Sequence, residues 1–108
     1  MPKTEYLQGA LDLLVLQTLS VAPNHGWGIQ QRIKQVTGEA LSVSQGSLYP
    51  ALHRLEAAGL LESEMTTSEN NRKARVYRLT AAGRKRLTQE TEDWRHFSLA
   101  IKRLLQNA

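Results

Sequence analysis

The stretch SQGSLYPALHRLEAAGLL, which runs from Ser44 to Leu61, contains the pattern that decides the fold. Leu48, Leu52 and Leu55 recur at intervals of four and three residues, which is the spacing of one face of an α-helix. Gly59 comes just after this pattern, and glycine suits the left-handed conformation that often follows the end of a helix. We therefore predict a helix that ends shortly before Gly59.

The beginning of this helix is marked by short polar residues. Ser44 and Ser47 are both suitable N-caps, and the sequence does not choose between them. Pro50 is expected in the first turn, where its missing N–H costs little. The helix would thus present small polar groups at the positive end of its dipole.

Two further helices are expected before this stretch. The second of them carries Ile29, Ile33 and Val36 along one apolar stripe and stops at Gly38. The first has apolar residues on more than one face and ends near the turn at residues 22–24. Its apolar positions are Leu7, Leu11, Leu13, Leu14, Val15, Leu16 and Leu19.

Beyond Gly59 the apolar period changes from that of a helix to that of a strand. Residues 61–65 and 76–79 alternate as strands do, and the polar residues 66–73 between them suit a hairpin loop. Thr80 then caps a last helix of about 25 residues, roughly 38 Å long. Three short helices, a hairpin and a long helix predict a mainly α fold.

This order of elements is the layout of a winged helix-turn-helix. We expect residues 1–80 to form that DNA-binding domain and residues 81–108 to form a C-terminal dimerisation helix. The last helix carries apolar residues near heptad spacing, and such a seam is more than a monomer of this size would expose. A homodimer would bury it, and folding back onto its own domain is the alternative. The seam consists of Leu87, Trp94, Phe97, Ile101, Leu104 and Leu105.

Composition narrows the possible functions. The chain has 108 residues, a formal net charge of +4 and no cysteine, which excludes disulfides, thiolate metal sites and cysteine nucleophiles. Its most apolar run is far shorter than the ~20 residues of a membrane-spanning helix, and its start is unlike a signal peptide, so we expect a cytoplasmic protein. A basic chain favours an acidic partner, of which nucleic acid is the commonest.

The recognition-helix stretch at 44–61 closely resembles that of the PadR family of bacterial transcription regulators. Residues 72–87, which read RKARVYRLTAAGRKRL, look like the family's wing strand and the entry to its last helix. The tetrapeptide at 26–29, GWGI, resembles the family's opening of helix two, with tryptophan in place of tyrosine. The resemblance covers roughly residues 6–105. It implies a homodimeric DNA-binding repressor that acts close to its own gene, of the short subgroup in which one C-terminal helix dimerises the protein.

One departure from the family concerns the wing. Many relatives carry glycine before the basic wing residues, whereas this chain has Asn70 and Asn71 there. Asparagine tolerates positive φ better than other non-glycine residues, so the turn can still form.

The candidate DNA-contacting residues lie at the start of the third helix and on the hairpin. Gln45 can pair with an adenine edge, and Gly46 lets the backbone approach DNA closely. The Tyr49 hydroxyl is expected on a phosphate, with packing against the second helix as the alternative. Long basic side chains on a wing suit phosphates or the minor groove. The full set is Ser44, Gln45, Gly46, Ser47, Tyr49, His53, Arg54, Arg72, Lys73 and Arg75.

A small aromatic or hydrophobic effector is a further possibility. Trp94 and Phe97, paired across a two-fold axis, would place four rings together, and flat or cationic compounds could stack there. The alternative is that these rings fill the dimer core.

Catalysis and docking onto another protein are the alternatives to DNA binding. The three histidines fall in different elements, and the sequence has no phosphate-binding glycine loop or nucleophile elbow, so we expect neither catalysis nor a metal or other cofactor. A winged helix that docks onto protein is the stronger rival. Such a module would more often expose apolar residues where this chain has a polar helix start and a basic hairpin.

Overall fold

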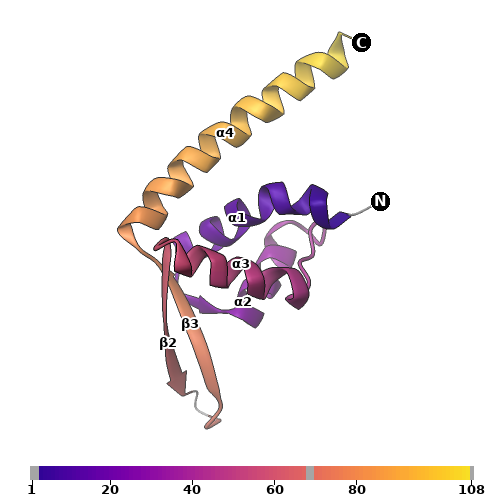
Figure 1. Cartoon of the computed structure of the whole chain (residues 1–108). Coiled ribbons are helices and arrows are strands. Elements are labelled where there is room, and N and C mark those ends of the chain that lie inside the picture. The colour runs from indigo at the N-terminus through magenta and orange to yellow at the C-terminus, as the bar shows by residue number, and fades with distance from the viewer. Residues whose placement is uncertain (1–2, 68–69, 108) are drawn as a thin grey trace.

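A computed structural model describes residues 3–67 and 70–107, with the backbone alone for residues 3–9. The chain folds into a mainly α winged helix-turn-helix followed by one long helix, as predicted (Figure 1). The elements are α1 (Lys3–Val21), β1 (Asn24–His25), α2 (Gly26–Val36), α3 (Gln45–Ala57), β2 (Leu61–Thr67), β3 (Lys73–Leu79) and α4 (Ala81–Gln106).

The core lies between α1, α2, α3 and the base of the sheet. Leu48, Leu52 and Leu55 are buried there, as the spacing predicts. Val36, which was expected on the same stripe as Ile29 and Ile33, is 66% exposed because it is the last residue of α2 and lies past the edge of the core. Leu7 falls where only the backbone is described. The remaining buried apolar residues are Leu11, Val15, Leu16, Leu19, Val43, Ala51, Leu60, Leu61, Tyr77 and Leu79.

The N-terminal cap of α3 is Ser44. The Ser47 backbone N–H donates a 3.2 Å hydrogen bond to the Ser44 hydroxyl, and Gln45 is the first helical residue. Pro50 is therefore the sixth residue of α3, and its placement in the first turn was wrong. Its missing N–H leaves the Gly46 carbonyl without its usual helical partner, which is a local weakness that the rest of the helix tolerates.

The turn after α3 satisfies the last carbonyls of the helix. Gly59 has a φ of +79°, and its N–H donates to the Glu56 carbonyl at 3.0 Å. The Leu60 N–H donates to the Leu55 carbonyl, also at 3.0 Å. This pair of bonds defines a Schellman motif, which turns the chain from α3 directly into β2. The predicted role of Gly59 is confirmed.

The sheet is antiparallel with the order β1-β3-β2. Its hairpin strands are longer than predicted, because Thr66 pairs with Ala74 and Thr67 with Lys73. Thr66 and Thr67 are β-branched and therefore favour strand pairing, whereas the polarity of this segment had indicated a loop. The two-residue strand β1 was not predicted. It is too short to show an alternating pattern and exists only because Asn24 pairs with Tyr77.

The base of α4 is tied to the turn that follows α3. The Thr80 hydroxyl accepts a hydrogen bond from the Gly83 N–H at 3.0 Å and donates one to the Gly59 carbonyl at 2.7 Å. The Thr80 N–H donates to the Leu60 carbonyl at 3.1 Å. A Cβ at Gly83 would lie 2.1 Å from that same carbonyl oxygen, so only glycine fits. The predicted cap is confirmed, and it fixes the direction in which α4 leaves the domain.

Most of α4 projects from the domain, in the opposite direction to the hairpin (Figure 1). Leu87 packs against the core of its own chain, whereas residues 92–107 are all exposed. The extents of the chain are 57 × 28 × 22 Å, so α4 makes it markedly elongated. In the described part of the chain, no helix is long and apolar enough to cross a membrane.

Replacing Gly83 with alanine should destabilise the fold. The added methyl overlaps the Leu60 carbonyl, and overpacking of this kind costs about 1–3 kcal/mol, which exceeds the gain of about 1 kcal/mol in helix propensity. We expect a lower free energy of unfolding in urea at a fixed protein concentration. Gly46→Ala is the matched control: its Cβ would meet nothing closer than the Ser44 hydroxyl at 3.9 Å, so it should be neutral or stabilising. An unchanged Gly83→Ala protein would contradict the close contact.

Candidate nucleic-acid interface

The outward face of α3 carries a small set of exposed residues. Gly46, Pro50 and His53 are separated by four and three residues and are all exposed, as is Gln45 at the helix start. Tyr49 is partly buried on one flank of this face. Pro50 was not predicted as a surface contact, although its spacing from Gly46 and His53 in the sequence places it on the same face of the helix. Its ring offers an apolar surface of the kind that can meet a thymine methyl group.

Tyr49 combines the two roles that the sequence left open. Its ring lies against the start of α2, so closely that a Cβ at Gly26 would fall 2.6 Å from the Tyr49 hydroxyl oxygen. The hydroxyl itself has no hydrogen-bond partner within residues 3–67 and 70–107. The ring is thus held by the fold while its hydroxyl is available to a ligand such as a phosphate.

Arg54 lies on the other flank of α3. Its guanidinium forms an ion pair with Asp12 of α1, and the two side chains are 57% and 28% exposed. An exposed pair of this kind contributes at most about 1 kcal/mol, because water and salt screen it. In the free protein Arg54 therefore links α3 to α1, and a phosphate contact at this position would compete with Asp12.

The hairpin has two chemically different faces. Antiparallel pairing places Ser63 opposite Tyr77, and Met65 opposite Arg75, on the same side of the sheet as the core residues Leu61 and Leu79. Thr67 and Lys73 continue this side toward the tip. We call it the front face, defined by Ser63, Met65, Thr67, Lys73, Arg75 and Tyr77.

The two acidic residues of β2 lie on the opposite, back face. Glu62 and Glu64 alternate with the front-face residues, and Arg78 on β3 pairs with both, at 2.7 and 3.1 Å. The hydrogen bond that Arg78 donates to Glu62, and then the one that it donates to Glu64, raise the pKa of Arg78. The strand period therefore keeps these two carboxylates away from the side that faces α3, and Arg78 neutralises part of their charge.

The front face is joined to α3 by a chain of hydrogen bonds. The Ser63 hydroxyl donates to Glu56 Oε2 at 2.7 Å, and Arg75 Nη1 donates to the Ser63 Oγ at 3.1 Å. Burial raises the pKa of the neighbouring Tyr77 phenol, and the charge of Glu56 raises it further while that of Arg75 opposes the shift. Glu56 is partly buried by this contact.

The tip of the hairpin carries the other basic residues. Asn71 has a φ of +62°, so asparagine adopts the left-handed conformation where relatives have glycine, as predicted. Arg72 and Lys73 follow it and are exposed. The start of α3 and this basic tip are the regions where the sequence placed DNA contacts, and Ser44, Gln45 and Gly46 are exposed there while Ser47 is partly buried.

The expected effector and dimer residues divide into two groups. Trp94 and Phe97 are 45% and 56% exposed, with ring centroids 5.7 Å apart, and Ile101, Leu104 and Leu105 continue the stripe toward the C-terminus. Leu87 differs from them because it is partly buried against the core of its own chain. Leu99 was not predicted; it is 48% exposed but lies off the stripe.

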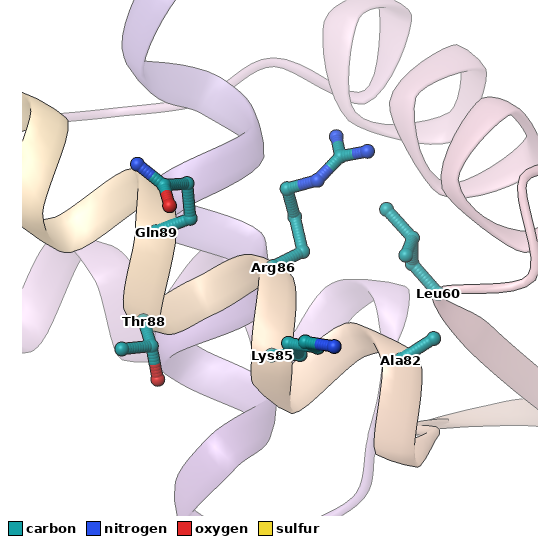
Figure 2. A pocket seen from close by; sticks show the side chains of 6 residues that line it. All are labelled: Leu60, Ala82, Lys85, Arg86, Thr88 and Gln89. Carbon is teal, nitrogen blue, oxygen red and sulfur yellow. The ribbon is translucent and has the colours of Figure 1, made fainter.

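A hollow of about 560 Å³ lies at the base of α4 (Figure 2). Leu60 and Ala82 give it apolar walls, and the long side chain of Arg86 extends beside Leu60. Lys85, Thr88 and Gln89 complete the lining. Trp94 and Phe97 do not line it, so within one chain this hollow and the expected aromatic effector site are separate.

The fold and this surface define a winged helix-turn-helix protein with a long C-terminal helix. The profile of the transcriptional regulator PadR-like family matches residues 15–89. The chain belongs to this family, and the resemblance seen in the sequence is confirmed.

Individual relatives agree with this assignment. The transcriptional regulator Rv3488 of Mycobacterium tuberculosis is 41% identical over 86 residues, which cover 80% of this chain and 77% of the relative. A transcriptional regulator from Clostridium thermocellum has a similar structure, with a TM-score of 0.84 and 27% identity over 92% of this chain and 96% of its own. The structure of a PadR-like transcriptional regulator from Bacillus cereus has a TM-score of 0.80 and 26% sequence identity, and the match covers 94% of this chain and 97% of the relative.

Tyr49→Phe should separate DNA binding from folding. The hydroxyl has no partner in the described structure, so its loss should leave the thermal midpoint unchanged. A hydrogen bond to a charged group contributes about 1.5–3 kcal/mol, so binding to a specific DNA site should weaken at least tenfold, or about 1.4 kcal/mol. Fluorescence anisotropy and thermal unfolding measure the two effects. Binding equal to that of the unaltered protein would exclude the phosphate role of Tyr49.

Proposed function

We propose that this chain is a homodimeric, sequence-specific DNA-binding regulator that represses a promoter close to its own gene in the cytoplasm. The observation that carries the proposal is the sorting of charge on the hairpin. Lys73 and Arg75 lie on the front face, which contacts α3 through Ser63, while Glu62 and Glu64 lie on the back face and are paired with Arg78. A surface arranged in this way suits a polyanion. The proposed activity is binding, without a catalytic step or a cofactor.

In the proposed complex the start of α3 enters the major groove. Gln45 reads a base edge, and Ser44 and Ser47 reach bases or phosphates near the positive end of the helix. Gly46 admits a close approach of DNA, because no side chain stands between the backbone and the groove. His53, one or two turns further along α3, is exposed and positioned for the phosphate backbone.

The hairpin supplies the second group of contacts. Lys73 and Arg75 on the front face, with Arg72 at the tip, bind the phosphate backbone or enter the minor groove beside the α3 contact. Tyr49 donates its hydroxyl to a phosphate between the two groups. Arg54 contributes only if a phosphate replaces Asp12 as its partner.

The proposed dimer forms through α4, so that residues 1–80 bind DNA and residues 81–108 join the two copies. The exposed stripe from Trp94 to Leu105 supports this division, because side chains of this size are rarely left in water on a projecting helix. Two-fold symmetry would place two α3 helices on half-sites about one helical turn apart, or a multiple of it. The operator would then be a near-palindrome.

An effector that relieves repression is proposed at the same stripe. Trp94 and Phe97 of the two copies would form an aromatic wall for a flat hydrophobic compound, provided that they do not simply fill the dimer core. Such a compound must bind more tightly to the DNA-free arrangement, since a ligand with equal affinity for both states shifts nothing.

Docking onto another protein is the second candidate function. Its main support is that Trp27 and Met65 are 60% and 52% exposed close to the proposed DNA surface. The basic and polar residues around them favour DNA, and the two functions differ in their response to salt.

Binding to the chain's own upstream intergenic DNA should be specific and strongly salt-dependent. If six to ten phosphates are neutralised per dimer, affinity should fall by about 10³ to 10⁵ between 50 and 200 mM salt. A gel-shift titration against scrambled competitor at several salt concentrations measures both properties. A flat salt response would favour the docking function.

Phe97→Asp should break the dimer, because it places a charge in the middle of the exposed stripe. Light scattering should show a monomer, and DNA affinity should fall because the two half-sites are no longer bound together. Val36→Asp is the matched control, because Val36, like Phe97, is an exposed apolar residue, with 66% of its surface accessible, but it lies on α2 rather than on the α4 stripe. A Phe97→Asp protein that remains dimeric would place the interface elsewhere.

A further inference from the structure

The hydrogen-bonded chain from Glu56 through Ser63 to Arg75 occupies a special place between α3 and the hairpin. Within the described residues, the bond between Ser63 and Glu56 is the only side-chain hydrogen bond between these elements. Beyond Ser63, the β2 residues 64–67 are all exposed. The tilt of the hairpin against α3 is therefore set at the base of the hairpin, where the Ser63 bond acts together with the turn before β2, the pairing of β3 with β1 and the burial of Tyr77.

A small change of tilt at Ser63 would be large at the tip. The four residue-to-residue steps from Ser63 to Thr67 span about 13 Å at 3.3 Å per step, so a rotation of about 10° moves the end of β2 by about 2 Å. Hydrogen bonds to phosphates do not survive displacements of that size. The contact at the base of the hairpin thus controls whether α3 and the tip can reach their phosphates together.

The same chain also directs the Arg75 side chain. One N–H of the guanidinium is used on Ser63, and the group has further donors left for a phosphate. Arg75 is exposed and has a long, flexible side chain, so the hydroxyl that it contacts restricts where its charge lies.

Glu56 stands out because it is an acid on the side of the protein that faces DNA in the proposed complex. A carboxylate there repels phosphates, whereas the two acids of β2, Glu62 and Glu64, lie on the back face. A positioning role explains why a carboxylate stands at this place. The Ser63 hydroxyl is hydrogen-bonded to both Glu56 and Arg75, so both charges lie close to the base of the hairpin.

We propose that Glu56 and Ser63 are positioning residues that set the tilt of the hairpin and the direction of Arg75, and thereby the specificity of DNA binding, without contacting DNA themselves. The inference rests on the proposed DNA-binding function. It assigns these two residues an effect on the ratio of specific to non-specific affinity, rather than on affinity as such.

The test compares two DNA probes for each variant of the full-length chain. One probe is the duplex that the unaltered protein enriches from a random pool, and the other is a scrambled duplex of equal length. Ser63→Ala removes the bridging hydroxyl without changing charge, and Ser63→Thr retains it. Glu56→Ala removes the acceptor and one negative charge, and Glu62→Ala removes the same charge from the back face.

The expected results for Ser63→Ala and Glu56→Ala differ between the two probes, whereas those for Glu62→Ala do not. Ser63→Ala should lower the specificity ratio about tenfold and leave scrambled-DNA binding unchanged, while Ser63→Thr stays within about threefold. The Glu56→Ala variant should bind scrambled DNA more tightly and the selected site no more tightly than the unaltered protein does. Its ratio of specific to non-specific affinity should therefore fall. Glu62→Ala should strengthen both equally and keep the ratio. Phosphate-ethylation interference should show that Ser63→Ala loses wing contacts and retains those of α3.

Three outcomes would overturn the inference. Ser63→Ala could keep the ratio of the unaltered protein, or Glu56→Ala could strengthen both probes as Glu62→Ala does. A loss of both affinities in parallel, together with a lower thermal midpoint, would show that the contact only stabilises the fold. If the unaltered protein enriches no duplex at all, the proposed function fails, and this inference fails with it.

Discussion

The junction at Gly59 and Leu60 is the constraint on which the rest of the structure depends. The left-handed glycine and the Schellman bonds turn α3 into β2, and the Leu60 carbonyl accepts from Thr80 at the start of α4. The absence of a side chain at Gly83 lets α4 approach this carbonyl. The proposed recognition helix α3, the hairpin strand β2 and the proposed dimerisation helix α4 therefore meet within a few residues of one another.

This arrangement has a mechanical consequence for the proposed regulator. A change in the angle of α4 cannot be absorbed by a loose linker, because Thr80 is bonded to both Gly59 and Leu60. Movement of the α4 pair would be transmitted to the end of α3 and the base of the hairpin, which carry the proposed DNA contacts. The proposed effector at the α4 stripe would act through the helix itself and through the hydrogen bonds at the base of α4, and it would need only a different affinity for the two arrangements.

The sequence predicted those features that depend on local chemistry. The leucine spacing of α3, the glycine at its end, the threonine cap of α4 and the left-handed asparagine at the wing each follow from a residue's own conformational preference. The order of elements and the family were also predicted from the sequence, chiefly from residues 44–61 and 72–87. Core burial of Leu48, Leu52 and Leu55 was readable because the helical period alone places them on one face.

Features that depend on partners far along the chain were not predicted. The pairing of Arg54 with Asp12 joins residues on different helices, and the strand β1 exists only through β3. The link between Glu56 and Arg75 needs the folded register of the hairpin. Pro50 was misplaced because two serines could cap the helix, and the choice of Ser44 moves the proline into the second turn.

The central claim is that α3 and the front face of the hairpin read DNA as a two-fold pair. In vitro selection from random duplexes tests it without knowledge of the operator. The account predicts enrichment of an inverted repeat whose half-sites are centred about 10 base pairs apart, or a multiple of that. A folded, dimeric protein that enriches no sequence, or only a single unrepeated site, would contradict the account.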